Sequence, residues 1–161
     1  KSLEEVIVHF LKERSLTLTT AESCTGGMIA ARITDVPGAS EVFKQGLVTY
    51  SNRAKRKLLD VKKTTLKEYG AVSEKTAKEM AKNGAFITGS DACVSVTGTA
   101  GPTGGTEEKP VGLVYIGCCY NNKTVVKEFH FKGERQKIRE QATANALILL
   151  RECILADKGQ E

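Results

Sequence analysis

Ser23 stands in a short segment of small polar residues that is typical of a catalytic or anion-binding turn. Residues 19–27 read Thr-Thr-Ala-Glu-Ser-Cys-Thr-Gly-Gly. Residues 16–20 alternate with the period of a strand and residues 28–33 suit a helix, so the segment is predicted to be a strand-to-helix corner. N–H groups at such a helix start can face a phosphate or a developing oxyanion, and here they belong to Thr25, Gly26 and Gly27. A purely structural role fits as well, because Ser and Thr are common helix N-caps.

Ser23 lacks the sequence surroundings of the familiar serine nucleophiles. The G-x-S-x-G elbow is absent, and Gly26 stands where the S-x-x-K motif requires lysine. The chain has two histidines, His9 and His130, and neither is placed near the corner by sequence. Because a serine hydroxyl needs a base or a pKa-shifting neighbour, we expect Lys or Tyr rather than His to activate Ser23. The thiol of Cys24 is an alternative nucleophile.

A second irregular segment follows a short apolar strand predicted at residues 92–96. Residues 97–106 read Thr-Gly-Thr-Ala-Gly-Pro-Thr-Gly-Gly-Thr and hold four of the 15 glycines. The segment is not a Walker A loop, and it lacks a G-x-G-x-x-G order with a helix directly behind it. Long loops after core strands often lie at ligands in α/β proteins, although a long turn between strands would look the same.

Composition predicts one cytoplasmic globular domain over residues 1–161. The chain is 40% hydrophobic, and it has no run of about 20 apolar residues and no apolar signal core at its beginning. The five cysteines are odd in number and include no C-x-x-C pair. We therefore expect neither a disulfide framework nor a zinc cluster.

The net charge of +5 comes largely from a basic cluster at residues 53–63. Such a cluster attracts anions. It contains no interleaved aromatic residues and no recognised nucleic-acid-binding motif. A phosphate-bearing small molecule, or a solvated helix face, is therefore favoured over nucleic acid as its explanation.

Hydrophobic periodicity predicts alternating helices and strands along the chain. Helical spacing occurs at residues 3–11, 52–59, 73–88 and 134–155, with Asn52 as a candidate cap. Residues 42–51, 111–119 and 124–131 look extended, and Asn121-Asn122 predicts a hairpin between the last two. This order favours an α/β fold, a three-layer α/β/α arrangement with a central mixed sheet.

Several segments, in order along the chain, closely resemble the CinA carboxy-terminal-domain family. They are Ala21–Gly27, Gly46–Asn52, Tyr69–Ser73, Gly98–Pro102 and Lys109–Gly112. The resemblance covers nearly the whole chain and is to the stand-alone form rather than to the domain of the longer competence/damage-inducible protein. It implies an amidohydrolase of pyridine nucleotide salvage that converts nicotinamide mononucleotide to nicotinic acid mononucleotide and ammonia.

The resemblance also implies the residues of the site. Ser23, Tyr50 and Lys55 match the family's catalytic positions: Ser23 would attack the carboxamide carbon, and Lys55 or Tyr50 would be the base. No metal or other cofactor is needed. If Lys55 points into the pocket, burial and the charges of Arg53, Arg56 and Lys57 would lower its pKa. Our candidates for contact with the substrate are Thr25, Gly26, Gly27, Gly98, Thr99, Ala100 and Gly101. Arg135 and Arg139, at the start of the last predicted helix, are candidates for its phosphate.

Two other classes of function remain open at this stage. One is a nucleotide-binding module without turnover, and the other is a nucleic-acid-associated domain. We expect a pyridine mononucleotide as the partner, no membrane and no nucleic acid, and the sequence is compatible with a homo-oligomer.

Overall fold

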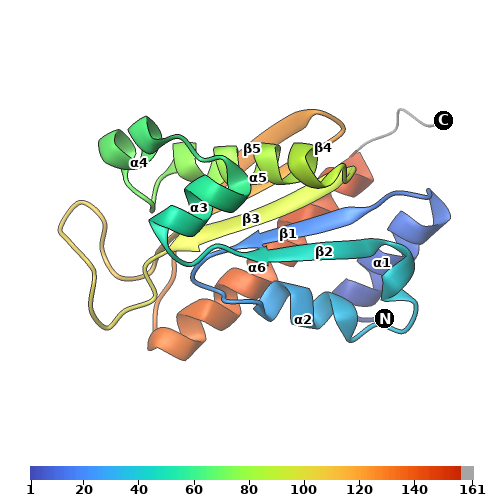
Figure 1. The fold of residues 1–161 in the computed structure, drawn as a ribbon. Coiled ribbons are helices and arrows are strands. Elements are labelled where there is room, and N and C mark those ends of the chain that lie inside the picture. Colours follow the sequence, from blue (N-terminus) through green and yellow to red (C-terminus); the bar gives the residue numbers. More distant parts are fainter. Residues whose placement is uncertain (157–161) are drawn as a thin grey trace.

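A five-stranded mixed sheet lies at the centre of the protein, as seen in a computed structural model that describes residues 1–156 (Figure 1). The strand order is β2-β1-β3-β4-β5. Strands β1 (Leu18–Glu22), β2 (Phe43–Val48) and β3 (Ala92–Gly98) are parallel, whereas β4 (Leu113–Tyr120) and β5 (Lys123–His130) are antiparallel to their neighbours. The expected domain runs to residue 161, and its last five residues lie outside the described part.

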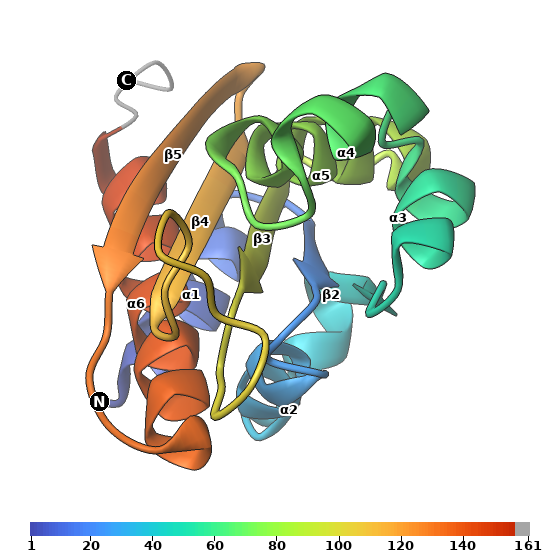
Figure 2. The same cartoon turned by 90° about the vertical axis from the view of Figure 1, so that its left-hand side faces the viewer.

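Helices cover both faces of this sheet. Helices α1 (Leu3–Glu13), α2 (Met28–Thr34) and α6 (Arg135–Ala156) lie on one face, and α3 (Asn52–Leu59), α4 (Lys63–Tyr69) and α5 (Glu74–Thr88) lie on the other (Figures 1 and 2). A short 3-10 turn, η1 (Ala39–Glu41), precedes β2. The predicted three-layer α/β/α fold is therefore confirmed. None of the helices in residues 1–156 is long and apolar enough to cross a membrane.

The two layers of helices explain why the three central strands are almost entirely buried. Every residue of β1 is buried, because one core cluster packs below the sheet and another above it. The lower cluster includes Ile29, Val94 and Leu147, and the upper one includes Leu59 and Met80. Edge strand β2 is different, because most of its residues are exposed.

Local sequence accounts for most element boundaries. Asn121 and Asn122 have φ values of 54° and 63°, as the tight turn of the predicted β4–β5 hairpin requires. Helix α3 begins where expected, but its cap is Ser51, whose side chain accepts a hydrogen bond from the Ala54 N–H at 3.0 Å, and not Asn52. Helix α4 was not expected from the periodicity.

The topology marks one edge of the sheet as the place for a ligand. From β1 the chain crosses to β2 on one side, and from β2 it crosses back past β1 to β3. The strand order thus reverses at β1, and α/β proteins bind ligands outside the carboxyl ends of the strands at such a point. Figure 2 looks onto that edge.

Candidate active site

Ser23 lies directly after β1, at the edge where the strand order reverses. Its backbone N–H donates to the carbonyl oxygen of Val96 in β3 at 2.9 Å, which fixes the corner to the sheet. Its side chain is mostly buried. Lys55 comes from the first turns of α3, and its Nζ donates to Ser23 Oγ at 2.8 Å. Two residues 32 positions apart are thus in direct contact.

Lys55 is the largest of the fully buried side chains, with 1% of its surface exposed. It is inside because α3 turns one face to the core, where Leu59 lies one turn further on. Besides Ser23, its Nζ donates to the carbonyl oxygens of Thr49 at 2.9 Å and Tyr50 at 3.3 Å. Its hydrogen-bond partners within residues 1–156 therefore include no carboxylate.

Burial without a carboxylate lowers the pKa of Lys55 to about 8, while the neighbouring Cys24 acts weakly in the opposite direction. Burial, one of the two causes expected from the sequence, is therefore confirmed, whereas Arg53, Arg56 and Lys57 are not among the causes of the shift. A protonated Lys55 has three N–H groups for its three acceptors. Once neutral, it can keep its bonds to the Thr49 and Tyr50 carbonyls and turn its lone pair toward Ser23 Oγ. The pair can therefore transfer a proton from serine to lysine.

Glu22 is a member of the site that the sequence interpretation missed. Its carboxylate is fully buried, and Oε1 accepts from the Thr25 hydroxyl at 2.6 Å and from the N–H groups of Gly27 and Ile29 at 3.1 Å each. Its Oε2 accepts from the Ala30 N–H at 3.0 Å. Glu22 thus caps α2 and holds the turn that carries Ser23. The available signal was an acidic residue at the end of a buried strand, just before a glycine-bearing corner.

The backbone of the corner differs from expectation. The N–H of Gly26 donates to the Ser23 carbonyl at 3.0 Å, and that of Gly27 donates to Glu22. Both N–H groups are thus occupied within the protein, and the prediction that they face a phosphate or a substrate oxyanion is wrong. The N-cap of α2 is Gly27, so Ser23 and Thr25 are not caps either.

Tyr50 is placed differently from Ser23 and Lys55. Its side chain is 62% exposed, and its hydroxyl accepts a hydrogen bond from Arg135 Nη2 at 3.1 Å. The Tyr50 hydroxyl forms no hydrogen bond with Ser23 or Lys55. The structure therefore brings only the carbonyl group of Tyr50 to the lysine.

Arg135 and Arg139, in the first turns of α6, both reach the site. Arg139 donates to the carbonyl oxygens of Cys24 at 2.9 Å and Thr25 at 3.2 Å, so it holds the corner from outside. Arg135 Nη1 donates to the Gly101 carbonyl at 2.8 Å. Arg135 thus connects two segments. Through Tyr50 it contacts the β2–α3 connection, and through Gly101 it contacts the glycine-rich loop, residues 97–106.

The glycine-rich loop closes the other side of the site. A Cβ on Gly98 would lie 2.9 Å from the Leu113 carbonyl oxygen, so only glycine fits at this end of β3. Thr99 is held by both its backbone groups, because its N–H donates to the Leu113 carbonyl at 3.0 Å and its carbonyl accepts from Gly112 at 2.8 Å. Ala100 is buried. A cavity of about 580 Å³ lies beyond, lined by Ala100, Pro102, Val111, Gly133, Glu134, Arg135 and Gln136.

Cys24, the alternative nucleophile, is buried, and burial raises the pKa of its thiol to about 11. It is therefore protonated near neutrality, when a thiol is a poor nucleophile. Within residues 1–156, no group of three or more His, Cys, Asp or Glu side chains could hold a metal ion.

Comparisons with known proteins agree with the fold and the order of the site segments. The family model for the CinA C-terminal domain matches residues 1–154. A CinA-like protein of Kosmotoga olearia is 54% identical over 155 residues, which cover 96% of this chain and 38% of that protein. A relative from Clostridium novyi is 53% identical over 150 residues, which cover 93% of this chain and 36% of the relative. The chain thus spans well under half the length of these relatives.

Solved structures give the same result. The competence/damage inducible protein CihA of Agrobacterium tumefaciens superposes with a TM-score of 0.91 at 40% identity, over 93% of this chain and 92% of that one. A CinA superfamily protein of Escherichia coli superposes with a TM-score of 0.91 at 33% identity, over 94% and 88% of the two chains. By sequence and by fold, the chain belongs to the CinA C-terminal domain family.

Proposed function

We propose that this chain is an amidohydrolase that converts nicotinamide mononucleotide to nicotinic acid mononucleotide and ammonia, with Ser23 as the nucleophile. The observation that carries the proposal is the 2.8 Å hydrogen bond between Lys55 Nζ and Ser23 Oγ in a buried setting. With a pKa of about 8, roughly a tenth of the lysine is neutral at pH 7, against about one part in 3,000 for an ordinary lysine. A base is thus present where serine needs one.

The reaction follows from this pair. Neutral Lys55 takes the proton of Ser23, whose Oγ attacks the carboxamide carbon. The protonated lysine then gives a proton to the leaving nitrogen, and ammonia departs. Water, deprotonated by the same lysine, cleaves the acyl-serine ester and releases the carboxylate. The N–H groups of Cys24 and Thr25, which donate to no backbone carbonyl within residues 1–156, are the candidates for holding the oxyanion.

The contacts favour Lys55 over Tyr50 as the base. Lys55 touches the serine hydroxyl, whereas the Tyr50 hydroxyl is bound to Arg135 and its ring faces solvent. We assign to Tyr50 two other tasks. Its carbonyl positions Lys55, and its exposed ring and Arg135 form the mouth of the site.

Arg135 is the better candidate for the substrate phosphate. Arg139 already donates hydrogen bonds from Nε and Nη2 to the Cys24 and Thr25 carbonyls of the Ser23 corner. Arg135 is bound to one carbonyl and one phenol, and a phosphate dianion would replace the neutral phenol with a charge-assisted hydrogen bond. Nicotinamide riboside, which lacks the phosphate, should therefore have a much lower kcat/KM than the mononucleotide. Equal kcat/KM values for the two would show that no phosphate site exists.

The testing experiment is an ammonia-release assay on nicotinamide mononucleotide. Ser23→Ala should remain folded and lose at least about a hundredfold in activity. Lys55→Arg, which keeps the charge but cannot act as a base near neutrality, should be about as inactive as Lys55→Ala. Lys57→Arg, on the exposed side of the same helix, is the matched control and should stay active.

Two results would contradict the proposal. Near-normal turnover by a folded Ser23→Ala variant would exclude serine as the nucleophile. Substantial activity in Lys55→Arg would show that Lys55 is not the base and that only its positive charge assists the reaction. The wild-type rate should also rise with pH toward a plateau above about pH 8, the pKa of Lys55.

A further inference from the structure

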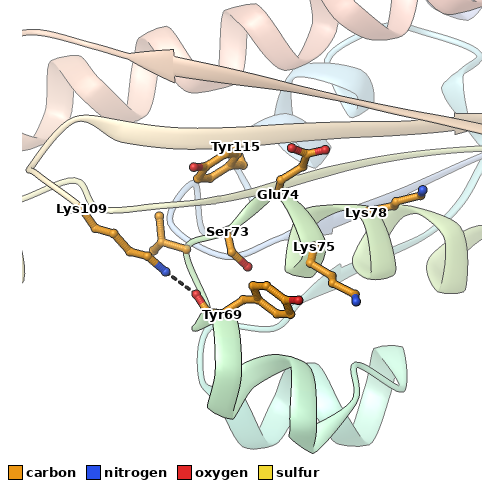
Figure 3. A pocket seen from close by; sticks show the side chains of 8 residues that line it. Tyr69, Ser73, Glu74, Lys75, Lys78, Lys109 and Tyr115 are labelled. Carbon is orange, nitrogen blue, oxygen red and sulfur yellow. Dashed lines mark hydrogen bonds between the residues drawn. The ribbon is translucent and has the colours of Figure 1, made fainter.

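A second cavity, of about 540 Å³, opens between α4, the start of α5 and β4 (Figure 3). Its lining shares no residue with the Ser23–Lys55 pair or with Arg135 and Arg139. Three lysines and two tyrosines stand in its wall: Lys75, Lys78, Lys109, Tyr69 and Tyr115. Its size falls in the range of small-ligand sites.

The cavity lining carries more positive than negative charge, and its lysines form no ion pair within residues 1–156. Residues 52–89, which form α3 to α5, contain ten Lys and Arg but four Asp and Glu, so this face carries the charge excess of the chain. Within residues 1–156, none of Lys75, Lys78 and Lys109 forms an ion pair. Glu74 is the one carboxylate in the lining. The cavity therefore favours an anion.

The cavity also offers aromatic surface. Lys75 Nζ lies 5.0 Å from the centroid of the Tyr69 ring, so this ring already forms a cation–π contact. Tyr115 stands on β4, across the cavity from Tyr69 (Figure 3). Val72 adds an apolar side chain to the lining. A flat aromatic group can pack between these walls while an attached anion reaches the lysines.

We infer that this cavity is a second binding site, for a nucleoside monophosphate. Its nucleobase would lie between the tyrosine rings and its phosphate among the lysines. The inference goes beyond the proposed amidase. Phosphate suits three ammonium groups that can each act as a point charge. A nucleobase attached to the phosphate would contact the apolar and aromatic part of the wall, which inorganic phosphate alone would leave without a contact.

The cavity is connected to the proposed active site through the glycine-rich loop. Lys109 Nζ donates to the Tyr69 carbonyl, which ties the far end of the loop to α4. The near end is tied to Arg135 through the Gly101 carbonyl. A phosphate that engages Lys109 competes with the Tyr69 carbonyl for its N–H groups. Ligand binding should therefore change hydrogen exchange in residues 99–112.

The test is calorimetric titration of the wild-type protein with adenosine 5′-monophosphate, with adenosine and inorganic phosphate as comparison ligands. We expect saturable binding of the monophosphate, and binding at least about tenfold weaker for each comparison ligand. Lys78→Gln should weaken monophosphate binding by a similar factor. Lys82→Gln, one turn further along α5 and outside the lining, is the matched control and should bind as the wild type does.

Three outcomes would overturn the inference. The first is no saturation at millimolar monophosphate, and the second is equal weakening by Lys82→Gln. The third is loss of binding in Arg135→Gln, which would place the ligand at the proposed active site instead. Because the titration involves no turnover, its failure and a failure of the proposed amidase reaction are separate results.

Discussion

Replacing Lys55 with Met should make the stability difference between variant and wild type depend on pH. Methionine is similar in length and carries no charge, so the variant lacks the buried ammonium group. The pKa of Lys55 falls from 10.5 to about 8 on folding, because burial disfavours the charged form. At about 1.4 kcal/mol per pKa unit, keeping Lys55 protonated inside the protein costs the native state about 3 kcal/mol.

The sign follows from proton binding in the two states. Well below pH 8, Lys55 is mostly protonated in both the native and the unfolded state, so nearly the whole cost is present. Between pH 8 and 10.5, the native state binds fewer protons than the unfolded state, so wild-type stability rises with pH relative to the variant. From pH 7 to pH 10, the free energy of unfolding of Lys55→Met minus that of the wild type should fall by about 2 to 3 kcal/mol.

Urea denaturation at pH 7, 8, 9 and 10 measures this difference directly. The variant also loses the hydrogen bonds to the Thr49 and Tyr50 carbonyls, but that loss is the same at every pH. Lys57→Met is the control, because the side chain of Lys57 is exposed to water in the native state as well. A change below about 1 kcal/mol across this pH range, or an equal change in Lys57→Met, would refute the argument that burial lowers the pKa of Lys55.

Three further substitutions test other parts of the site and its support. Glu22→Gln should lower the free energy of unfolding in urea by about 3 kcal/mol, because an amide cannot accept the hydrogen bonds of both carboxylate oxygens; an unchanged midpoint would show that the buried charge is not needed. Cys24→Ser should keep its ammonia release, since burial holds the thiol protonated; inactivity in a folded variant would make Cys24 the nucleophile instead. Gly112→Ala should lower the melting temperature by several degrees, because φ is 98° and a Cβ would lie 2.1 Å from the Phe131 carbonyl oxygen; wild-type melting would mean that the backbone moves aside freely.

Periodicity predicted the fold well because most elements combine an apolar face with local end signals. The β4–β5 hairpin was readable from Asn121-Asn122, and α5 from the helical spacing over residues 73–88. Helix α4 was missed because Leu66 is its only strongly apolar residue before Tyr69, so no stripe repeats. Its place in the fold comes from packing rather than from a pattern of its own.

The site was harder to predict than the fold, because burial is a tertiary property. Lys55 sits in a basic run and looks like Arg56 and Lys57, yet it alone of these three is fully buried. The family resemblance singled it out; its charge pattern did not. Glu22 was missed for the same reason, since nothing local shows that four donors of the following turn converge on its carboxylate.

The exposed edge strand β2 has a consequence for how the protein responds to heat. The two carbonyls that hold Lys55 belong to Thr49 and Tyr50, directly after β2, and the Thr49 N–H still pairs with the Glu22 carbonyl of β1 at 2.8 Å. If this edge opens locally, water reaches Lys55 and removes the free-energy cost of its charged form. An opening that costs about 1.4 kcal/mol leaves about a tenth of the molecules in that state. The lysine should therefore become an ordinary surface cation on warming, while the helices and the other strands are still folded.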